Sequence, residues 1–286
     1  MSQAKPPNAD ALPGRNDWLF GWFSWYVRRF VRKHFNAVRM LGDHPLDDPA
    51  IVGPDRPLIV YLNHPGWWDP LMAVYLADRF MRDRRHGAPI DAEALEKYAV
   101  FRHLGFFGVE PSSATGGRVF LRSASACLDH GWALWVTAQG EFSDPRQRPI
   151  ELMPGLAHLV RRRARQAANT DSPAAAGHVL PLAIEYPFWT ERTPEALLHV
   201  GEPMPIATFA DAPVEATHER LCVALGDAMD RLAESAIARD LESLRVVAQG
   251  QANVGGAYDL WRRITAGLRG QRFDPAHRLD RRQRPA

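Results

Sequence analysis

The chain has 286 residues, of which 46% are hydrophobic and 24% charged, and its formal net charge is +2. This composition is typical of a globular protein with one large α/β domain or two small ones, and the nearly balanced charge gives no support to nucleic-acid binding. Two cysteines, Cys127 and Cys222, lie far apart in apolar helical contexts, so we expect reduced core residues rather than a disulfide scaffold or a metal site. We expect no membrane-spanning helix, because no apolar run is long enough, and no secretory signal peptide.

The N-terminal region divides into two parts. Residues 1–16 are rich in Pro, Ala, Asn and Asp, which predicts a disordered N-terminus. Residues 17–41 predict a helix with an aromatic first half, including Trp18, Trp22 and Trp25, and a basic second half. Its cations are Arg28, Arg29, Arg32 and Lys33. Such a helix suits the membrane interface, with its rings at headgroup depth and its cations on anionic lipid; the alternative is a helix packed on the protein's own core.

A short strand and the turn after it follow the Pro- and Asp-rich connector of residues 42–57. Residues 58–62, LIVYL, predict a buried strand, and the following NHPG predicts a sharp turn. His64 therefore stands just beyond the C-terminal end of a core strand, where open α/β sheets bind their ligands. Asp69 follows five residues later, so one loop can bring the two side chains together. A carboxylate bonded to one imidazole nitrogen makes the other a better base for a hydroxyl proton. The alternative is that both residues only brace the turn.

The same spacing occurs a second time, in His86 and Asp91. This pair follows a charged run, residues 82–85, instead of an apolar strand. We therefore interpret residues 86–91 as a solvated loop and give the functional role to His64 and Asp69.

The rest of the chain alternates between helical and strand patterns. We expect helices over residues 71–85, 91–104, 117–130, 155–166 and 214–247, strands over residues 132–137, 178–186 and 197–206, and a turn that leads into a short apolar segment over residues 104–111. This alternation predicts an α/β sheet flanked by helices within residues 42–248, while residues 249–286 predict a short helix and a flexible basic tail. The arginines at the end of the 155–166 helix indicate a solvated helix end or a second contact with anionic lipid.

The segment NHPGWWD, residues 63–69, resembles the first motif of the glycerophospholipid acyltransferase superfamily, which includes the lysophosphatidic acid and glycerol-3-phosphate acyltransferases. The resemblance implies that His64 is the general base and that Asp69 orients it. It covers roughly residues 55–205, and it implies a glycerol-3-phosphate acyltransferase-like sheet.

Two further motifs agree only in part. Glu110 matches the acidic position of the second motif, but Pro111 stands where the family has an arginine that helps to hold the acceptor's phosphate. Arg118 and Arg122 share one helix face beyond it and either replace that cation or are ordinary surface charges.

The third motif corresponds to residues 138–144, AQGEFSD, in which Gly140 matches. Gln139 replaces Glu, Glu141 replaces Thr and Phe142 replaces Arg. Arg146 and Arg148 lie close enough in sequence to compensate. The simpler interpretation is that the acceptor is not a plain glycerol phosphate.

The resemblance implies a membrane-associated acyltransferase of phospholipid biosynthesis. It would move a fatty acyl group from acyl-CoA or acyl carrier protein to a hydroxyl of a lysophospholipid or related lipid, with no cofactor or metal. We expect it at the cytoplasmic face of the inner membrane, bound peripherally to an anionic surface. The candidate catalytic residues are His64 and Asp69. The candidate substrate-binding residues are Asn63, Trp67, Trp68, Arg118, Gly140, Glu141, Arg146 and Arg148.

Two other functions stay open. A lipid hydrolase would use the same His64 and Asp69 to activate water. A non-catalytic lipid-binding relative would account for the departures in the second and third motifs.

Overall fold

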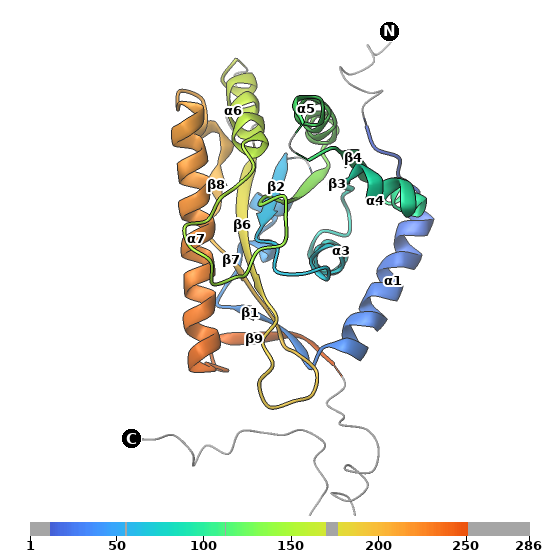
Figure 1. The fold of residues 1–286 in the computed structure, drawn as a ribbon, viewed down its shortest axis with the longest axis vertical. Helices are drawn as coiled ribbons and strands as arrows, with labels where there is room; N and C mark the ends of the chain where they lie inside the picture. The colour runs from blue at the N-terminus through green and yellow to red at the C-terminus, as the bar shows by residue number, and fades with distance from the viewer. Residues whose placement is uncertain (1–11, 55, 112, 170–176, 251–286) are drawn as a thin grey trace, which may run out of the picture.

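A computed structural model describes residues 12–54, 56–111, 113–169 and 177–250 (Figure 1). The protein is α/β, with a mixed nine-stranded sheet flanked by helices. The predictions for residues 1–11 and for the C-terminal helix and tail beyond residue 250 lie outside the described residues.

The strand order in the sheet is β4-β3-β5-β2-β6-β7-β1-β9, and β8 pairs with β6. Strands β2 to β6 run parallel to one another, whereas β7 and β8 are antiparallel to β6 and β9 is antiparallel to β1. The strands are β1 Ala37–Leu41, β2 Leu58–Leu62, β3 His86–Asp91, β4 Phe106–Val109, β5 Ala133–Thr137, β6 His178–Glu185, β7 Ala196–Val200, β8 Met204–Pro205 and β9 Leu244–Gln249.

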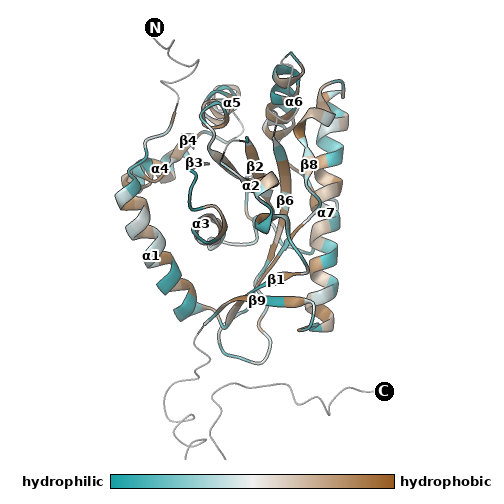
Figure 2. Cartoon of the chain, turned by 180° about the vertical axis from the view of Figure 1, so that it is seen from behind, coloured by the Kyte–Doolittle hydropathy of each residue, from teal (hydrophilic) through white to brown (hydrophobic). Residues whose placement is uncertain are grey.

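Helices cover both faces of the sheet (Figures 1 and 2). The α-helices are α1 Asp17–His34, α2 Pro49–Val52, α3 Asp69–Phe80, α4 Ala92–Lys97, α5 Ala114–Asp129, α6 Gly155–Ala168 and α7 Val214–Ala238. Short 3-10 helices are η2 Pro45–Asp47, η3 Ala99–His103 and η5 Ile206–Phe209. In the described residues, no helix combines the length and the apolar character needed to cross a bilayer.

The central strand β2 explains why the sheet has two cores. All five of its residues are buried, as expected for a parallel strand covered on both faces. Ile59 and Tyr61 pack with α5, α6 and α7, whereas the alternate residues, such as Val60, pack with α1 and α3. The Tyr61 hydroxyl donates a hydrogen bond to the Leu221 carbonyl of α7, at 2.9 Å. The strand is thus fixed from both sides, and so is the loop that follows it.

Two predictions about local structure are wrong. Residues 37–41 form β1 and do not continue the N-terminal helix, which ends at His34. They pair with β7 and β9, partners more than 150 residues away in sequence, which a local pattern does not reveal. Residues 86–91 form β3 and not a solvated loop.

The His86 side chain is buried and fully engaged at the start of β3. Trp135 Nε1 donates to its Nδ1 at 3.2 Å, and its Nε2 lies 3.0 Å from the Met81 carbonyl oxygen. Burial lowers the pKa of His86 to about 3, so the imidazole is neutral. Its role in the fold is that of a core residue with satisfied hydrogen bonds.

Other boundaries moved by a few residues. The helix predicted to reach residue 85 ends at Phe80, and residues 99–103 form η3 instead of continuing α4. Residues 244–247, predicted as the end of a helix, belong to the edge strand β9 after the left-handed Arg239 ends α7. The strands predicted at residues 58–62, 132–137 and 178–186 are confirmed within one residue, and Asp91 is the N-cap of α4.

Candidate active site

The candidate site lies at the C-terminal ends of three adjacent strands, β5, β2 and β6. His64 follows β2, Gln139 follows β5 and Tyr186 follows β6. Because these strands are parallel, their C-terminal ends meet at one edge of the sheet, where α/β proteins bind ligands.

At the centre of the site is the pair predicted from the sequence. His64 Nδ1 lies 2.6 Å from Asp69 Oδ2. Asp69 is completely buried and is the first residue of α3, where the helix dipole favours a negative charge. The Gly66 N–H also donates to Oδ2, at 3.1 Å, and the Tyr186 hydroxyl donates to Oδ1 at 2.7 Å. Three donors therefore hold one buried carboxylate, and that carboxylate fixes the imidazole.

Tyr186 was not among the predicted site residues. Burial, and next the negative charge of Asp69, raise the pKa of the Tyr186 phenol well above its usual value, so the phenol remains a donor. The available signal was its position: it directly follows the strand that pairs with β2.

The loop that carries His64 is fastened to both neighbouring strands. The Asn63 side chain bridges the backbone of Ile184 in β6, with its Nδ2 3.0 Å from the carbonyl oxygen and its Oδ1 2.8 Å from the amide nitrogen. The His64 amide donates to Gln139 Oε1 at 2.8 Å, and the Ser143 amide donates to the His64 carbonyl at 3.0 Å. Asn63, predicted as a substrate ligand, therefore holds the loop in place. Gln139 does the same from the other side.

His64 also lines a cavity of about 1110 Å³. Ligand pockets usually measure about 300–1,000 Å³, so this one is large enough for a sizeable ligand. Its walls come from α1, α3, β3, β4 and the starts of α5 and α6, and they are mainly apolar. Aromatic side chains on these walls are Phe20, Phe23, Phe101, Phe106 and Phe120.

The pair stands where the cavity meets solvent. Trp67 and Phe142 line the cavity beside His64, yet 60% and 64% of their surfaces are exposed. The Phe142 ring centroid lies 4.4 Å from that of the His64 imidazole. Since Asp69 occupies Nδ1, Nε2 is the nitrogen that remains for a ligand in this cavity.

The other predicted substrate ligands divide into two groups. Trp67 and Gly140 line the cavity, and Gly140 has a φ of +78°, a backbone conformation that favours glycine. Trp68 does not line it and instead packs edge-on against Phe35 and Tyr186. It supports the loop from behind.

The predicted polar ligands are exposed side chains outside the cavity: Arg118, Glu141, Arg146 and Arg148. Arg146 forms a bidentate pair with Asp144, at 2.9 and 2.6 Å. Arg148 pairs with Asp230 of α7. Both cations thus have acidic partners on the surface, and neither reaches His64.

The residues that the structure describes contain no group of three or more His, Cys, Asp or Glu side chains placed to hold a metal ion. No protein-family model matches the chain, and no curated protein matches it in sequence. What the site does is therefore inferred from its own chemistry.

Proposed function

We propose that this protein is an acyltransferase that moves a fatty acyl group from a thioester, acyl-CoA or acyl carrier protein, to a hydroxyl of a lysophospholipid or related lipid. One observation carries the proposal: a hydrogen-bonded His64–Asp69 pair stands at the open end of a large apolar cavity. A base with an orienting carboxylate is the device that activates a hydroxyl, and the cavity suits a hydrocarbon chain. The motif resemblance at residues 63–69 points the same way.

In the proposed reaction, His64 Nε2 takes the proton of the acceptor hydroxyl as its oxygen attacks the thioester carbonyl. The new C–O bond forms and the C–S bond breaks. The sulfur leaves as a thiolate, and the His64 imidazolium, which holds the proton, returns it to that thiolate. Asp69 fixes the tautomer and stabilises the imidazolium charge, and Tyr186 and Gly66 keep the carboxylate aimed.

The apolar walls provide the binding energy for the acyl chain. Each methylene that leaves water contributes about 0.8 kcal/mol. His86, one of the polar residues in this lining, is neutral and has both nitrogens engaged, so it does not oppose a hydrocarbon neighbour. A long chain can thus anchor the donor while its thioester stays at His64.

The acceptor site lacks the cations of a phosphate-binding site. Pro111 and Phe142 stand at two positions where the related motifs carry arginine, and Arg146 and Arg148 have acidic partners. Phe142 presents an aromatic ring to His64 instead. These features favour an acceptor without a phosphate monoester next to the reacting hydroxyl.

We also propose that the sheet is of the glycerol-3-phosphate acyltransferase-like type and that α1 rests on the cytoplasmic face of the membrane. Trp18, Trp22 and Trp25 are exposed by 78%, 53% and 53%, and Figure 2 shows the last turns of α1 as hydrophilic. Interfacial tryptophans and cations, each cation contributing about 1 kcal/mol on anionic lipid, support that contact. Phe30 of α1 meets Trp67 edge-on at 6.0 Å, which links this helix to the mouth of the cavity.

The test is acyl transfer from labelled acyl-CoA to a total lipid extract by the wild type, His64→Ala and His158→Ala. His158 is an exposed histidine of α6 and serves as the matched control. We expect a labelled lipid whose formation falls about 10²–10⁴-fold in His64→Ala and not in the control.

The test distinguishes the proposed reaction from its competitors. Free labelled fatty acid that depends on His64, with no acylated lipid, would indicate a hydrolase. Equal lipid product from the wild type and His64→Ala would contradict the mechanism.

A further inference from the structure

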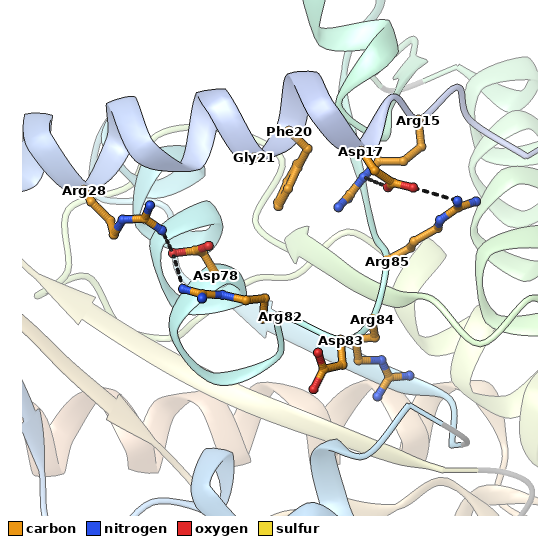
Figure 3. Close-up of a pocket in the computed structure, with 10 residues that line it drawn as sticks. All are labelled: Arg15, Asp17, Phe20, Gly21, Arg28, Asp78, Arg82, Asp83, Arg84 and Arg85. Carbon is orange, nitrogen blue, oxygen red and sulfur yellow. Dashed lines mark hydrogen bonds and ion pairs between the residues drawn. The ribbon is translucent and has the colours of Figure 1, made fainter.

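A second pocket, of about 470 Å³, lies between the first turns of α1 and the segment that ends α3 and begins β3 (Figure 3). Its lining is almost entirely charged. The charged residues are Arg15, Arg28, Arg82, Arg84, Arg85, Asp17, Asp78 and Asp83. Neither the catalytic pair nor the motif resemblance involves these residues.

Two clusters of the same composition make up most of this lining. Asp78 accepts a hydrogen bond from Arg28 and lies 3.6 Å from Arg82, while Asp17 pairs with Arg15 at 3.1 Å and Arg85 at 2.7 Å. In Figure 3 the two clusters lie on either side of Phe20. Since each carboxylate is shared by two guanidinium groups, each cluster keeps one positive charge.

The pocket as a whole is cationic. Five guanidinium groups against three carboxylates leave two positive charges around the space. Arg84 contributes its positive charge to the pocket and no hydrogen bond, because its buried side chain donates to the carbonyl oxygens of Val52 and Gly53. Arg82 and Arg85 are different: 72% and 52% of their side-chain surfaces are exposed, so donors remain accessible on them.

Arg15 gives an independent sign that the site is incomplete. Its side chain is buried, and its guanidinium carbon lies 3.6 Å from the Phe20 ring centroid. Its Nη1 has no hydrogen-bond partner among the described residues. A buried N–H without an acceptor is costly, so an oxygen-rich anion in the pocket would satisfy it.

We propose that this pocket binds a phosphate group. A phosphate monoester brings a charge of about −1.5 to −2 and several acceptor oxygens, which match the two positive charges and the donors of both clusters. A carboxylate brings half the charge and only two oxygens. Bound phosphate would bridge Arg82 of one cluster and Arg85 of the other, and so tie α1 to the body of the protein.

The phosphate has two possible sources. Gly21 lines the pocket, and the exposed Trp18 and Trp22 flank it on α1, so an acidic lipid headgroup is one source. A soluble phosphate ester is the other. The proposal does not depend on acyl transfer, since Phe20 is the one described residue that lines both this pocket and the cavity at His64.

The first experiment measures thermal unfolding of the full chain with inorganic phosphate. The variants are the double substitution Arg82→Gln with Arg85→Gln, and Arg231→Gln as a matched control on exposed α7, on the opposite side of the molecule (Figure 1). At roughly tenfold excess over Kd, phosphate should raise Tm of the wild type and the control by about 2–3 °C. The double variant should show only the nonspecific stabilisation that phosphate gives to proteins in general, because phosphate ions are excluded from protein surfaces. Equal shifts in all three proteins would overturn the proposal.

A further variant tests the site even if the double variant does not fold. Asp83 is exposed and lines the pocket, so Asp83→Asn removes a negative charge without removing a donor. We expect a severalfold lower Kd for phosphate in this variant, and an unchanged or higher Kd would count against the site.

The source is then identified with two probes, each compared between the wild type and the double variant. One is phosphatidylcholine vesicles with and without phosphatidic acid, and the other is adenosine 3′,5′-bisphosphate. Loss of binding to the acidic vesicles alone in the double variant identifies a lipid headgroup, and loss of nucleotide binding alone identifies a soluble ester. If neither probe discriminates between the two proteins, the site does not recognise phosphate.

Discussion

The two His-x-x-x-x-Asp segments have the same spacing and opposite outcomes. His64 and Asp69 meet at 2.6 Å, because the residues between them form a turn that begins α3. His86 and Asp91 stand at the two ends of β3, which at about 3.3 Å per residue separates them by roughly 16 Å. Asp91 caps α4 and His86 is a neutral core residue.

The difference shows that a fixed spacing has no meaning without the backbone between its ends. In the first segment the strand ends before the histidine and the residues between the pair form a turn, whereas in the second segment the strand itself runs from the histidine to the aspartate. The first two predictions make the same kind of change in both segments, and the other two each test one segment alone.

The largest effect is expected for the two aspartates. Asp69→Asn should lower acyl transfer by up to the 10²–10⁴-fold expected for His64→Ala, because an amide neither fixes the required tautomer nor stabilises the imidazolium. Asp91→Asn should leave transfer unchanged, because asparagine caps a helix as well as aspartate does. Steady-state kinetics on both variants checks this, and comparable losses in the two would remove the distinction between the segments.

For the stability of the fold, substitution of the histidine in the second segment should cost more than substitution of the histidine in the first. His86→Ala leaves Trp135 Nε1 without its acceptor in the core and should lower the free energy of unfolding by about 2–4 kcal/mol. His64→Ala, at the open end of the cavity, should cost less than about 1 kcal/mol. Urea unfolding of both variants measures the difference, and a larger loss for His64→Ala would contradict this account.

The pH dependence of stability gives a second readout for His86. Its pKa is lowered to about 3 in the folded state, so between pH 6.5 and 3 the unfolded chain binds a proton that the folded chain does not. The stabilisation is complete above pH 6.5 and is lost on acidification, by up to about 1.4 kcal/mol per pH unit. His86→Ala should therefore flatten the stability curve between pH 6.5 and 5, whereas a curve parallel to that of the wild type would show that folding does not lower the pKa of His86.

The sequence predicted the main features of the fold that depend on local patterns. The apolar run at residues 58–62 gave β2, and the turn formers after it placed His64 and Asp69 correctly. It did not predict β1 or β9, because both are edge-side strands whose pairing partners are remote in sequence.

The supporting residues of the site were missed for a similar reason. Asn63 contacts Ile184, and Gln139 contacts the His64 amide, across 121 and 75 residues. Their roles depend on strand order, which no local pattern contains. Two of the three predicted arginine ligands, Arg146 and Arg148, pair at the surface with Asp144 and Asp230 and do not line the cavity.

The smallest expected effect concerns Tyr186, whose hydroxyl donates to Asp69 of the first segment. Among the described residues, no tyrosine donates a hydrogen bond to Asp91 of the second segment. Tyr186→Phe keeps the ring and removes one of the three donors of Asp69, so kcat should fall about tenfold to a hundredfold, the usual effect of losing a hydrogen bond to a charged group. KM should stay nearly constant, because Tyr186 does not line the cavity.

Tyr75→Phe is the control, since Tyr75 is a buried tyrosine of α3 that also lies outside the cavity lining. If the two variants lose equal activity, or if Tyr186→Phe changes only KM, then Tyr186 does not act through the carboxylate that holds His64.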